Sequence, residues 1–368
     1  VYIDYFAPKK PELKSAHFIY ETYSRRYLTC WGNNEEGELG RGNRTDYSSP
    51  EPFISATNTT TIKWIDVVSN ENSTCARFDK GNQLYCFGDN SSGQLGIGQS
   101  QAGVGPQRVN EFSWSKVVGS GNHYCGISGG MLYCWGDNSY GQLGIGVTKD
   151  IFAPQQVGSA SWSKISAGLT HSCGIKSTGT IWCWGDNSYG QLGDGTDQRS
   201  WTPISSALDR WNDLSAGDSF SCGVREDNTL WCWGANDFGQ LGDDSRVDRD
   251  QPVLIGENFS QVFAGTTQAC AIDLDGKLWC WGDNSMGQLG LGDTVDRLRP
   301  AQVGTDSWSK IFPENGYTCG VKSGRHWCWG DNSFGQFGDG TTIGSTLPHI
   351  IGFSGIANIS FGAEHICQ

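Results

Sequence analysis

The sequence repeats one short motif seven times at a nearly constant spacing, and this repeat limits the possible folds more than any other feature. The fullest form, Cys-Trp-Gly-Asp-Asn-Ser-Tyr-Gly-Gln-Leu-Gly, begins at Cys134 and again at Cys183. The seven copies begin at Cys30, Cys86, Cys134, Cys183, Cys232, Cys280 and Cys328, mostly 48 or 49 residues apart. A period of this length is typical of an array of equal structural units, so most recurrent residues are expected to build the scaffold.

One unit, residues 162–205, has the pattern of four short strands. Runs of alternating or β-branched residues at 162–168, 171–176, 180–184 and 201–204 are separated by turn-forming residues. The 52 glycines of the chain fit many tight turns. The sequence therefore predicts an all-β fold, a seven-bladed β-propeller of four-stranded antiparallel blades.

Twelve of the 14 cysteines form six close pairs, each separated by a polar turn. This is the layout of a β-hairpin with one cysteine on each arm, where facing cysteines reach disulfide distance. Zinc sites would need closely spaced ligand pairs that this chain lacks. The cysteines therefore indicate disulfides and a secreted, extracellular protein. The predicted pairs are Cys75–Cys86, Cys125–Cys134, Cys173–Cys183, Cys222–Cys232, Cys270–Cys280 and Cys319–Cys328.

The two remaining cysteines lie near the two ends of the chain, in complementary halves of the repeat. Cys30 occupies the second half of a unit, and Cys367 occupies the first half. The N- and C-terminal segments are therefore predicted to share one blade that closes the ring, with a Cys30–Cys367 disulfide. The alternative is that residues 17–22, which resemble a second strand, fill this place and leave both cysteines unpaired. We expect residues 1–16 to form an extended N-terminal arm and residues 17–368 the propeller.

Six Asn-x-Ser/Thr sequences predict N-linked glycosylation and support a secretory route. Four of them fall within residues 43–92, and the one at position 90 is the weakest because it lies in the recurrent turn. The predicted acceptors are Asn43, Asn58, Asn72, Asn90, Asn258 and Asn358.

The Gly-Asp-Asn-Ser-x-Gly-Gln-Leu-Gly signature resembles the repeats of the regulator of chromosome condensation family, over about residues 30–367. The resemblance implies a seven-bladed propeller and a blade assembled from both chain ends. The paired cysteines depart from nuclear and cytosolic members. They resemble instead secreted bacterial repeats and the extracellular domains of crinkly-type plant receptor kinases. Nucleotide exchange on a small GTPase, the founding activity, does not suit an oxidising compartment, and the Gly-Trp-Arg-His-Thr repeat of light-sensing members is absent.

The sequence indicates no catalytic residue, no metal site and no cofactor. His123, His171 and His365 occupy equivalent repeat positions, which favours a structural role over catalysis. The acidic stretches 242–250 and 292–296 lack the twelve-residue calcium loop, so we interpret them as solvated loops.

The net charge of −13 and the lack of a basic tract argue against nucleic acid as a partner, and no apolar stretch is long enough to insert into a membrane. The leading hypothesis is a non-enzymatic extracellular interaction or structural glycoprotein that binds a protein partner or further copies of itself through propeller loops. The segments 99–110, 198–209 and 245–256 vary most and mark the expected binding face. The alternatives are a secreted enzyme inhibitor and a glycan-binding propeller, for which Trp201 is a candidate contact.

Overall fold

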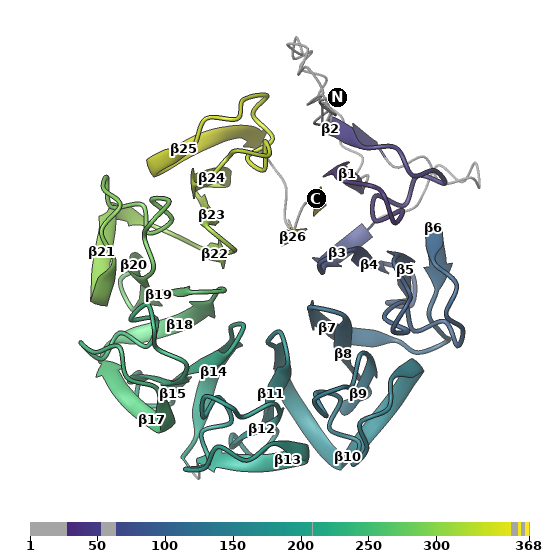
Figure 1. Cartoon of the computed structure of the whole chain (residues 1–368), viewed down its shortest axis with the longest axis horizontal. Coiled ribbons are helices and arrows are strands. Elements are labelled where there is room, and N and C mark those ends of the chain that lie inside the picture. Colours follow the sequence, from purple (N-terminus) through teal and green to yellow (C-terminus); the bar gives the residue numbers. More distant parts are fainter. Residues whose placement is uncertain (1–27, 53–63, 208, 355–359, 362–364, 368) are drawn as a thin grey trace, which may run out of the picture.

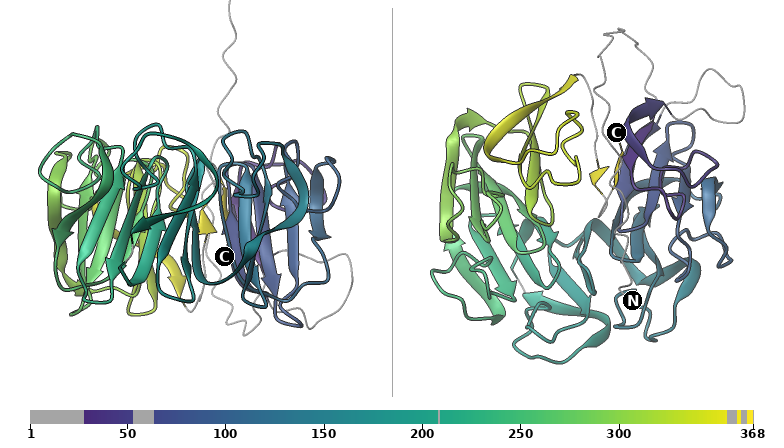
Figure 2. Two further views of the ribbon diagram at one scale, coloured as in Figure 1. Left: turned by 90° about the horizontal axis from the view of Figure 1, so that it is seen from below. Right: turned by 45° about the horizontal axis from the view of Figure 1, so that its top comes forward.

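Short strands and glycine-rich turns form antiparallel sheets arranged radially around a central opening (Figure 1). The structure is a computed structural model, and it describes residues 28–52, 64–207, 209–354, 360–361 and 365–367. Figure 2 shows from the side that the strands of each blade run along the axis of the ring. The seven blades confirm the predicted propeller. No helix occurs among the described residues, and so none that could cross a membrane.

Each blade places its first strand near the central opening and its fourth strand at the outer rim. Blade 1 contains β26 (Ser360–Phe361), β27 (His365–Cys367), β1 (Thr29–Gly32) and β2 (Tyr47–Pro52). Blade 2 contains β3 (Trp64–Ser69), β4 (Ser73–Phe78), β5 (Leu84–Gly88) and β6 (Gly103–Arg108). Blades 3 and 4 contain β7 (Trp114–Ser120), β8 (His123–Ser128), β9 (Met131–Gly136), β10 (Ile151–Ala167), β11 (His171–Lys176), β12 (Ile181–Gly185) and β13 (Ser200–Ala207).

The last three blades follow the same order without interruption. Blade 5 contains β14 (Trp211–Ala216), β15 (Phe220–Arg225), β16 (Leu230–Gly234) and β17 (Arg249–Gly256). Blade 6 contains β18 (Phe259–Ala264), β19 (Gln268–Asp273), β20 (Lys277–Gly282) and β21 (Arg297–Ser307). Blade 7 contains β22 (Lys310–Pro313), β23 (Tyr317–Lys322), β24 (Arg325–Gly330) and β25 (Ser345–Ser354).

Strand β10 differs from the predicted separate strand at 162–168, because it runs unbroken from the rim of blade 3 to the centre of blade 4. Ser161 still pairs with Met131 of β9, and the next residue, Trp162, already pairs with Lys176 of β11. No turn separates the two partners, so a single strand joins the two blades in one seven-stranded sheet.

Blade 1 closes the ring with segments from both ends of the chain, as predicted. Strand β1 pairs with β27 and places Cys30 directly opposite Cys367. Figure 1 shows the first and last strands side by side. A Cβ atom at Gly338 would lie 3.0 Å from Trp31, so the last described signature packs against the first blade. Residues 17–22 lie outside the described residues, and the division at residue 16 stays a prediction.

All 14 cysteines form disulfides, and each bond joins facing residues of neighbouring strands. In blade 4, for example, Cys173 and Cys183 face each other with a Cα–Cα distance of 4.1 Å. The disulfides are Cys30–Cys367, Cys75–Cys86, Cys125–Cys134, Cys173–Cys183, Cys222–Cys232, Cys270–Cys280 and Cys319–Cys328.

Neighbouring blades are joined by the tryptophan that follows the motif cysteine. The indole Nε1 of Trp233 donates to the carbonyl of Gln191 in the preceding blade at 2.9 Å. Gly193 has φ +71°, and a Cβ atom there would lie only 2.7 Å from the same Nε1. Glycine thus permits both the left-handed backbone and the close approach. Equivalent hydrogen bonds to the signature Gln carbonyl are made by Trp135, Trp184, Trp281 and Trp329.

Candidate interaction face

One end of the propeller carries two sets of loops that the antiparallel order of the strands brings together. The loops that connect third and fourth strands contain the repeated signature, and we call them the signature loops. The turns between first and second strands lie at the same end, as the hydrogen bond from Asp89 N to Asn72 O illustrates in blade 2. This end, the signature-loop face, is the candidate interaction face because its loops vary at defined positions while the blades repeat.

Buried amide side chains hold each signature loop in one conformation. In blade 4, Asn187 Oδ1 accepts from Leu192 N, and its Nδ2 donates to the carbonyls of Thr196 and Gln198. Gln191 Oε1 accepts from Tyr189 N at 3.0 Å. These hydrogen bonds satisfy the backbone of the loop internally, so the side chain of Tyr189 is free to face solvent. The loop is therefore ordered before any partner arrives, which lowers the entropic cost of binding.

The variable position of the signature forms an apolar arc over consecutive blades. It is apolar or aromatic in blades 3 to 7 and polar in blades 1 and 2. A second exposed apolar position, eleven residues after the signature Asn, accompanies it in blades 5 to 7. Phe334 is 82% exposed and Ile343 is 77% exposed, which is unusual for side chains of this size. The six residues of this patch on blades 5 to 7 are Phe238, Val247, Met286, Val295, Phe334 and Ile343.

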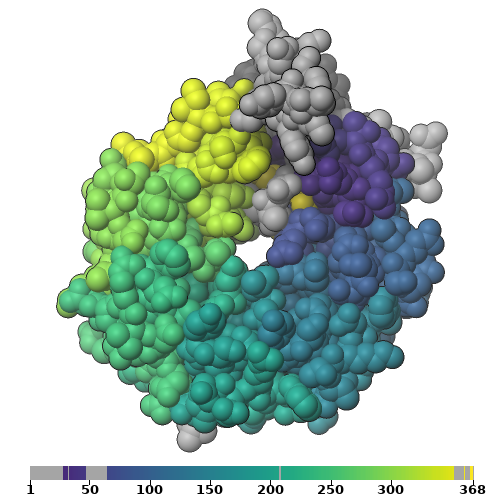
Figure 3. Space-filling model, viewed as in Figure 1, coloured from purple at the N-terminus to yellow at the C-terminus, as the bar shows by residue number. Residues whose placement is uncertain are grey.

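The mouth of the central channel opens on the same face and is acidic. A cavity of about 340 Å³ lies here, lined by the first turns of blades 2 to 7 (Figure 3 shows the central opening). Its walls include Glu71, Asp218 and Glu314. Burial, together with the nearby Asp218 carboxylate, raises the pKa of Glu314 to about 8. Burial and Glu71 raise the pKa of Asp218 to about 6, against a hydrogen bond from Thr266.

Replacing Glu314 with glutamine should flatten the alkaline side of the pH–stability curve. Glu314 has an ordinary pKa of 4.5 and a folded pKa of about 8, so the folded state holds the proton more tightly. Proton binding by the Glu314 carboxyl therefore stabilises the folded state fully below pH 4.5. This stabilisation is lost as the pH rises to about 8. The free energy of unfolding should therefore fall less between pH 5 and pH 8.5 in Glu314→Gln than in the wild type. Denaturant titrations at both pH values measure this; equal falls would contradict it.

The three equivalent histidines lie between blades and face no solvent. His171 Nε2 lies 2.9 Å from Ser221 Oγ, and that hydroxyl donates to the carbonyl of Gln191. Since the serine proton is already used, Nε2–H must be the donor to Ser221. Burial lowers the pKa of His123 to about 4 and those of His171 and His365 to about 3, so all three are neutral near pH 7. These buried His–Ser/Thr pairs join blades and have no access to a substrate.

The predicted glycan acceptors have different surroundings. Asn43 and Asn72 are exposed in loops of blades 1 and 2, and Asn258 is exposed between β17 and β18. Asn90 is fully buried, and its Nδ2 donates to the carbonyls of Gln99 and Gln101. A glycan on that nitrogen would break the signature loop, so the structure corrects the prediction at Asn90. Asn58 and Asn358 lie outside the described residues.

The acidic stretches contain side chains held by arginines. Asp243 pairs with Arg249 and Asp293 with Arg297, both at 2.6 Å. Arg246 pairs with Asp296 at 2.7 Å and ties the signature loops of blades 5 and 6 together. No cluster of three or more His, Cys, Asp or Glu side chains suited to a metal ion occurs among the described residues.

The variable segments named from the sequence only partly lie on the candidate face. They begin in the signature loops and then run down the rim as the outer strands β6, β13 and β17. Trp201 is 52% exposed at the start of β13 and backs onto Gly141 of the preceding blade. The apolar patch and the acidic mouth were not predicted. The changing residue inside an otherwise constant signature was the available signal for the patch.

Comparison with known proteins gives one matching family model and several similar folds. A model of the RCC1-like domain matches residues 17–320. The ultraviolet-B receptor UVR8 of Arabidopsis thaliana is 29% identical over 101 residues, which cover 27% of this chain and 22% of the receptor. The aligned segment thus spans about a fifth of that curated relative.

Two solved structures share the whole propeller. Prp20p of Saccharomyces cerevisiae, studied for its binding to Gsp1p and histones, superposes with a TM-score of 0.81 at 18% identity, covering 94% of this chain and 91% of Prp20p. Human WBSCR16 has a TM-score of 0.79 at 18% identity, covering 93% and 98%. The receptor kinase CR4 ectodomain of Physcomitrella patens has a TM-score of 0.52 at 21% identity, covering 82% and 69%. At these identities the likeness shows the fold alone.

Proposed function

Because this chain belongs to the RCC1-like domain family, we propose that it is an extracellular, non-enzymatic interaction module that binds a protein partner through its signature-loop face. The observation that carries this proposal is the exposed apolar patch on blades 5 to 7 beside the acidic channel mouth. Several large apolar side chains exposed on one face, near charged residues, are typical of protein-binding surfaces. The binding of Prp20p to Gsp1p and histones is in keeping with this use of the fold.

The charge of the face favours a partner with basic residues. Glu71 and Asp218 lie at the channel mouth, and the whole chain carries a net charge of −13. Two copies meeting face to face would bring two acidic mouths together, which like-charge repulsion disfavours. We therefore propose a different protein that presents apolar side chains around a basic protrusion. Self-assembly through other surfaces is compatible with this arrangement.

The extracellular location rests on the seven disulfides, because paired thiols of this kind persist in oxidising compartments. The exposed Asn43, Asn72 and Asn258 are the proposed glycan acceptors. Disulfides rigidify a protein that works outside the cell, and glycans make it more soluble. Neither feature supplies catalytic chemistry.

The apolar patch should be required for partner capture from extracellular medium of the source organism. Phe334→Asp combined with Met286→Asp places two charges in the patch without touching the core, since both side chains are mostly exposed. We expect this variant to lose at least about tenfold in partner retention, as hot-spot apolar residues usually do. Immobilised, disulfide-intact protein secreted by a eukaryotic host, with quantitative mass spectrometry of what it retains, measures the effect.

Ile350→Asp is the matched control, because Ile350 is an exposed apolar residue on β25 at the rim. It should retain the partner as the wild type does. A set of retained proteins that is the same for the patch variant and the wild type would refute the signature-loop face as the binding surface. If the wild type self-associates in sedimentation experiments and the patch variant does not, the partner is a second copy of this chain and not a different protein.

A further inference from the structure

Three blades fill an aromatic slot beside the hairpin of their second and third strands with a cation of their own. In blades 4, 5 and 7 the last residue of the second strand is Lys or Arg, and it lies over the tryptophan that precedes the motif cysteine. Such cation–π contacts are attractive because the ring face carries negative charge density. The distances from cation to ring centroid are 3.1 Å for Lys176 over Trp182, 3.8 Å for Arg225 over Trp231 and 3.8 Å for Lys322 over Trp327.

Blades 2 and 3 place an aromatic ring near the same slot. Phe78 ends the second strand of blade 2 and contacts Trp64 at 6.1 Å between ring centroids. In blade 3 the ring of Phe112 lies 4.9 Å from that of Tyr133. In five blades a cation or an aromatic ring of the protein itself thus lies at or near the slot.

Blade 6 breaks this pattern at two positions. Asp273 stands where Lys176 stands in blade 4, and Phe259 replaces the larger Trp162. Asp273 Oδ2 accepts from Trp279 Nε1 at 2.9 Å, so the carboxylate lies at the edge of the indole and its face is left without a cation from the described residues. Phe259 and Trp279 meet edge to face, with centroids 6.5 Å apart.

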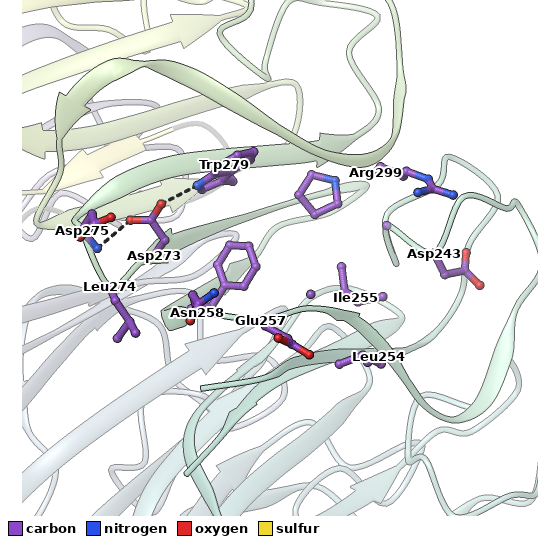
Figure 4. A pocket seen from close by; sticks show the side chains of 14 residues that line it. Asp243, Leu254, Ile255, Glu257, Asn258, Asp273, Leu274, Asp275, Trp279 and Arg299 are labelled. Carbon is purple, nitrogen blue, oxygen red and sulfur yellow. Dashed lines mark hydrogen bonds between the residues drawn. The ribbon is translucent and has the colours of Figure 1, made fainter. Parts of the chain in front are cut away.

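A groove opens where the cation is missing. It has a volume of about 770 Å³ and lies between blades 5 and 6, bounded by the β17–β18 connection and the β19–β20 hairpin (Figure 4). Trp279 and Phe259 supply its aromatic wall, and Glu257, Asp273 and Asp275 supply carboxylates. Asp273 Oδ1 also accepts from Asp275 N at 2.9 Å, which fixes the turn. Arg299 also lines the groove (Figure 4), and its guanidinium is paired with Asp244 at 2.7 Å. The part of the groove beside Trp279 therefore combines an aromatic surface with carboxylates.

We propose that this groove binds a lysine or arginine side chain of a partner protein segment, which takes the place that Lys176, Arg225 and Lys322 occupy in their own blades. The sister blades show which chemical group this aromatic slot accepts, and the carboxylates supply the complementary charge. Gly242 and Asp243 of the blade 5 signature loop border one part of the groove, whereas the aromatic slot lies beside the β19–β20 hairpin at the opposite end of the strands. The test of this site therefore does not depend on the apolar patch of the proposed function.

The test follows the indole N–H of Trp279 by NMR in disulfide-intact protein labelled with ¹⁵N-tryptophan. The resonance is assigned by its loss in Trp279→Phe. Titration with the capped peptide Gly-Arg-Gly should shift it saturably, while capped Gly-Glu-Gly should leave it in place. Asp273→Lys supplies an internal cation, as in blades 4 and 7, and should weaken the response at least about tenfold. The same variant should unfold at no lower temperature than the wild type.

Trp231 is the internal control, because Arg225 already covers its ring. Its resonance should not follow the arginine peptide. An unshifted Trp279 would overturn the proposal, and so would an undiminished response in Asp273→Lys or an equal shift of Trp231. If the Trp279 resonance shifts with an N-acetylglucosamine oligomer but not with the arginine peptide, the groove binds a glycan and the cation proposal is wrong.

Discussion

Removing the Cys30–Cys367 disulfide by paired substitution with serine should lower the free energy of unfolding by about 5 kcal/mol. This bond joins residues 337 positions apart, so it restricts the unfolded chain more than any hairpin disulfide does. It also holds β27, a strand of only three residues, against β1. Without the bond, we expect blade 1 to open before the other blades. Denaturant unfolding, followed by fluorescence and by limited proteolysis near the C-terminus, measures both effects.

The matched control is the double substitution Cys222→Ser and Cys232→Ser. This disulfide closes a loop of only 10 residues, for which chain entropy predicts a loss of about 2.5–3 kcal/mol. The order of the two losses is the informative result. A ring-closing variant no less stable than the hairpin variant would contradict a covalently closed propeller.

Replacing Trp233 with alanine should lower the free energy of unfolding by about 3–5 kcal/mol. Trp233 is fully buried between blades 4 and 5, and the cavity cannot collapse because rigid sheets border it on both sides. The carbonyl of Gln191 would lose one donor, although Ser221 Oγ still donates to it at 3.0 Å. Thermal and denaturant unfolding measure the loss.

Trp201→Ala is the matched control, because Trp201 is half exposed in the outer strand of the preceding blade. It should cost at most about 1 kcal/mol. Trp233→Phe keeps most of the apolar volume but removes the indole donor, so its loss should fall between the two. If both alanine variants lost the same stability, the motif tryptophan would not be what couples the blades.

Most of the propeller could be predicted because its information is local and repeated seven times. A hairpin pairs residues about ten positions apart, so the register that places Cys173 opposite Cys183 follows from strand alternation and the turn between them. Because the same pattern occurs seven times, the strands and turns can be assigned even where one copy departs from it. The place of Asn90 in the recurrent turn already made it the weakest predicted acceptor, but only the structure shows that its side chain is buried inside its own loop.

The sequence by itself determined the number of blades, the hairpin disulfides and the residues that build the scaffold, since each depends on contacts within one repeat. The tertiary structure alone decided that β10 runs through two blades, that Glu314 and Asp218 meet at the channel mouth, and that Trp279 borders an open groove. These features join residues from different blades. Their burial and charge depend on how the closed ring brings the blades together, which no single repeat encodes.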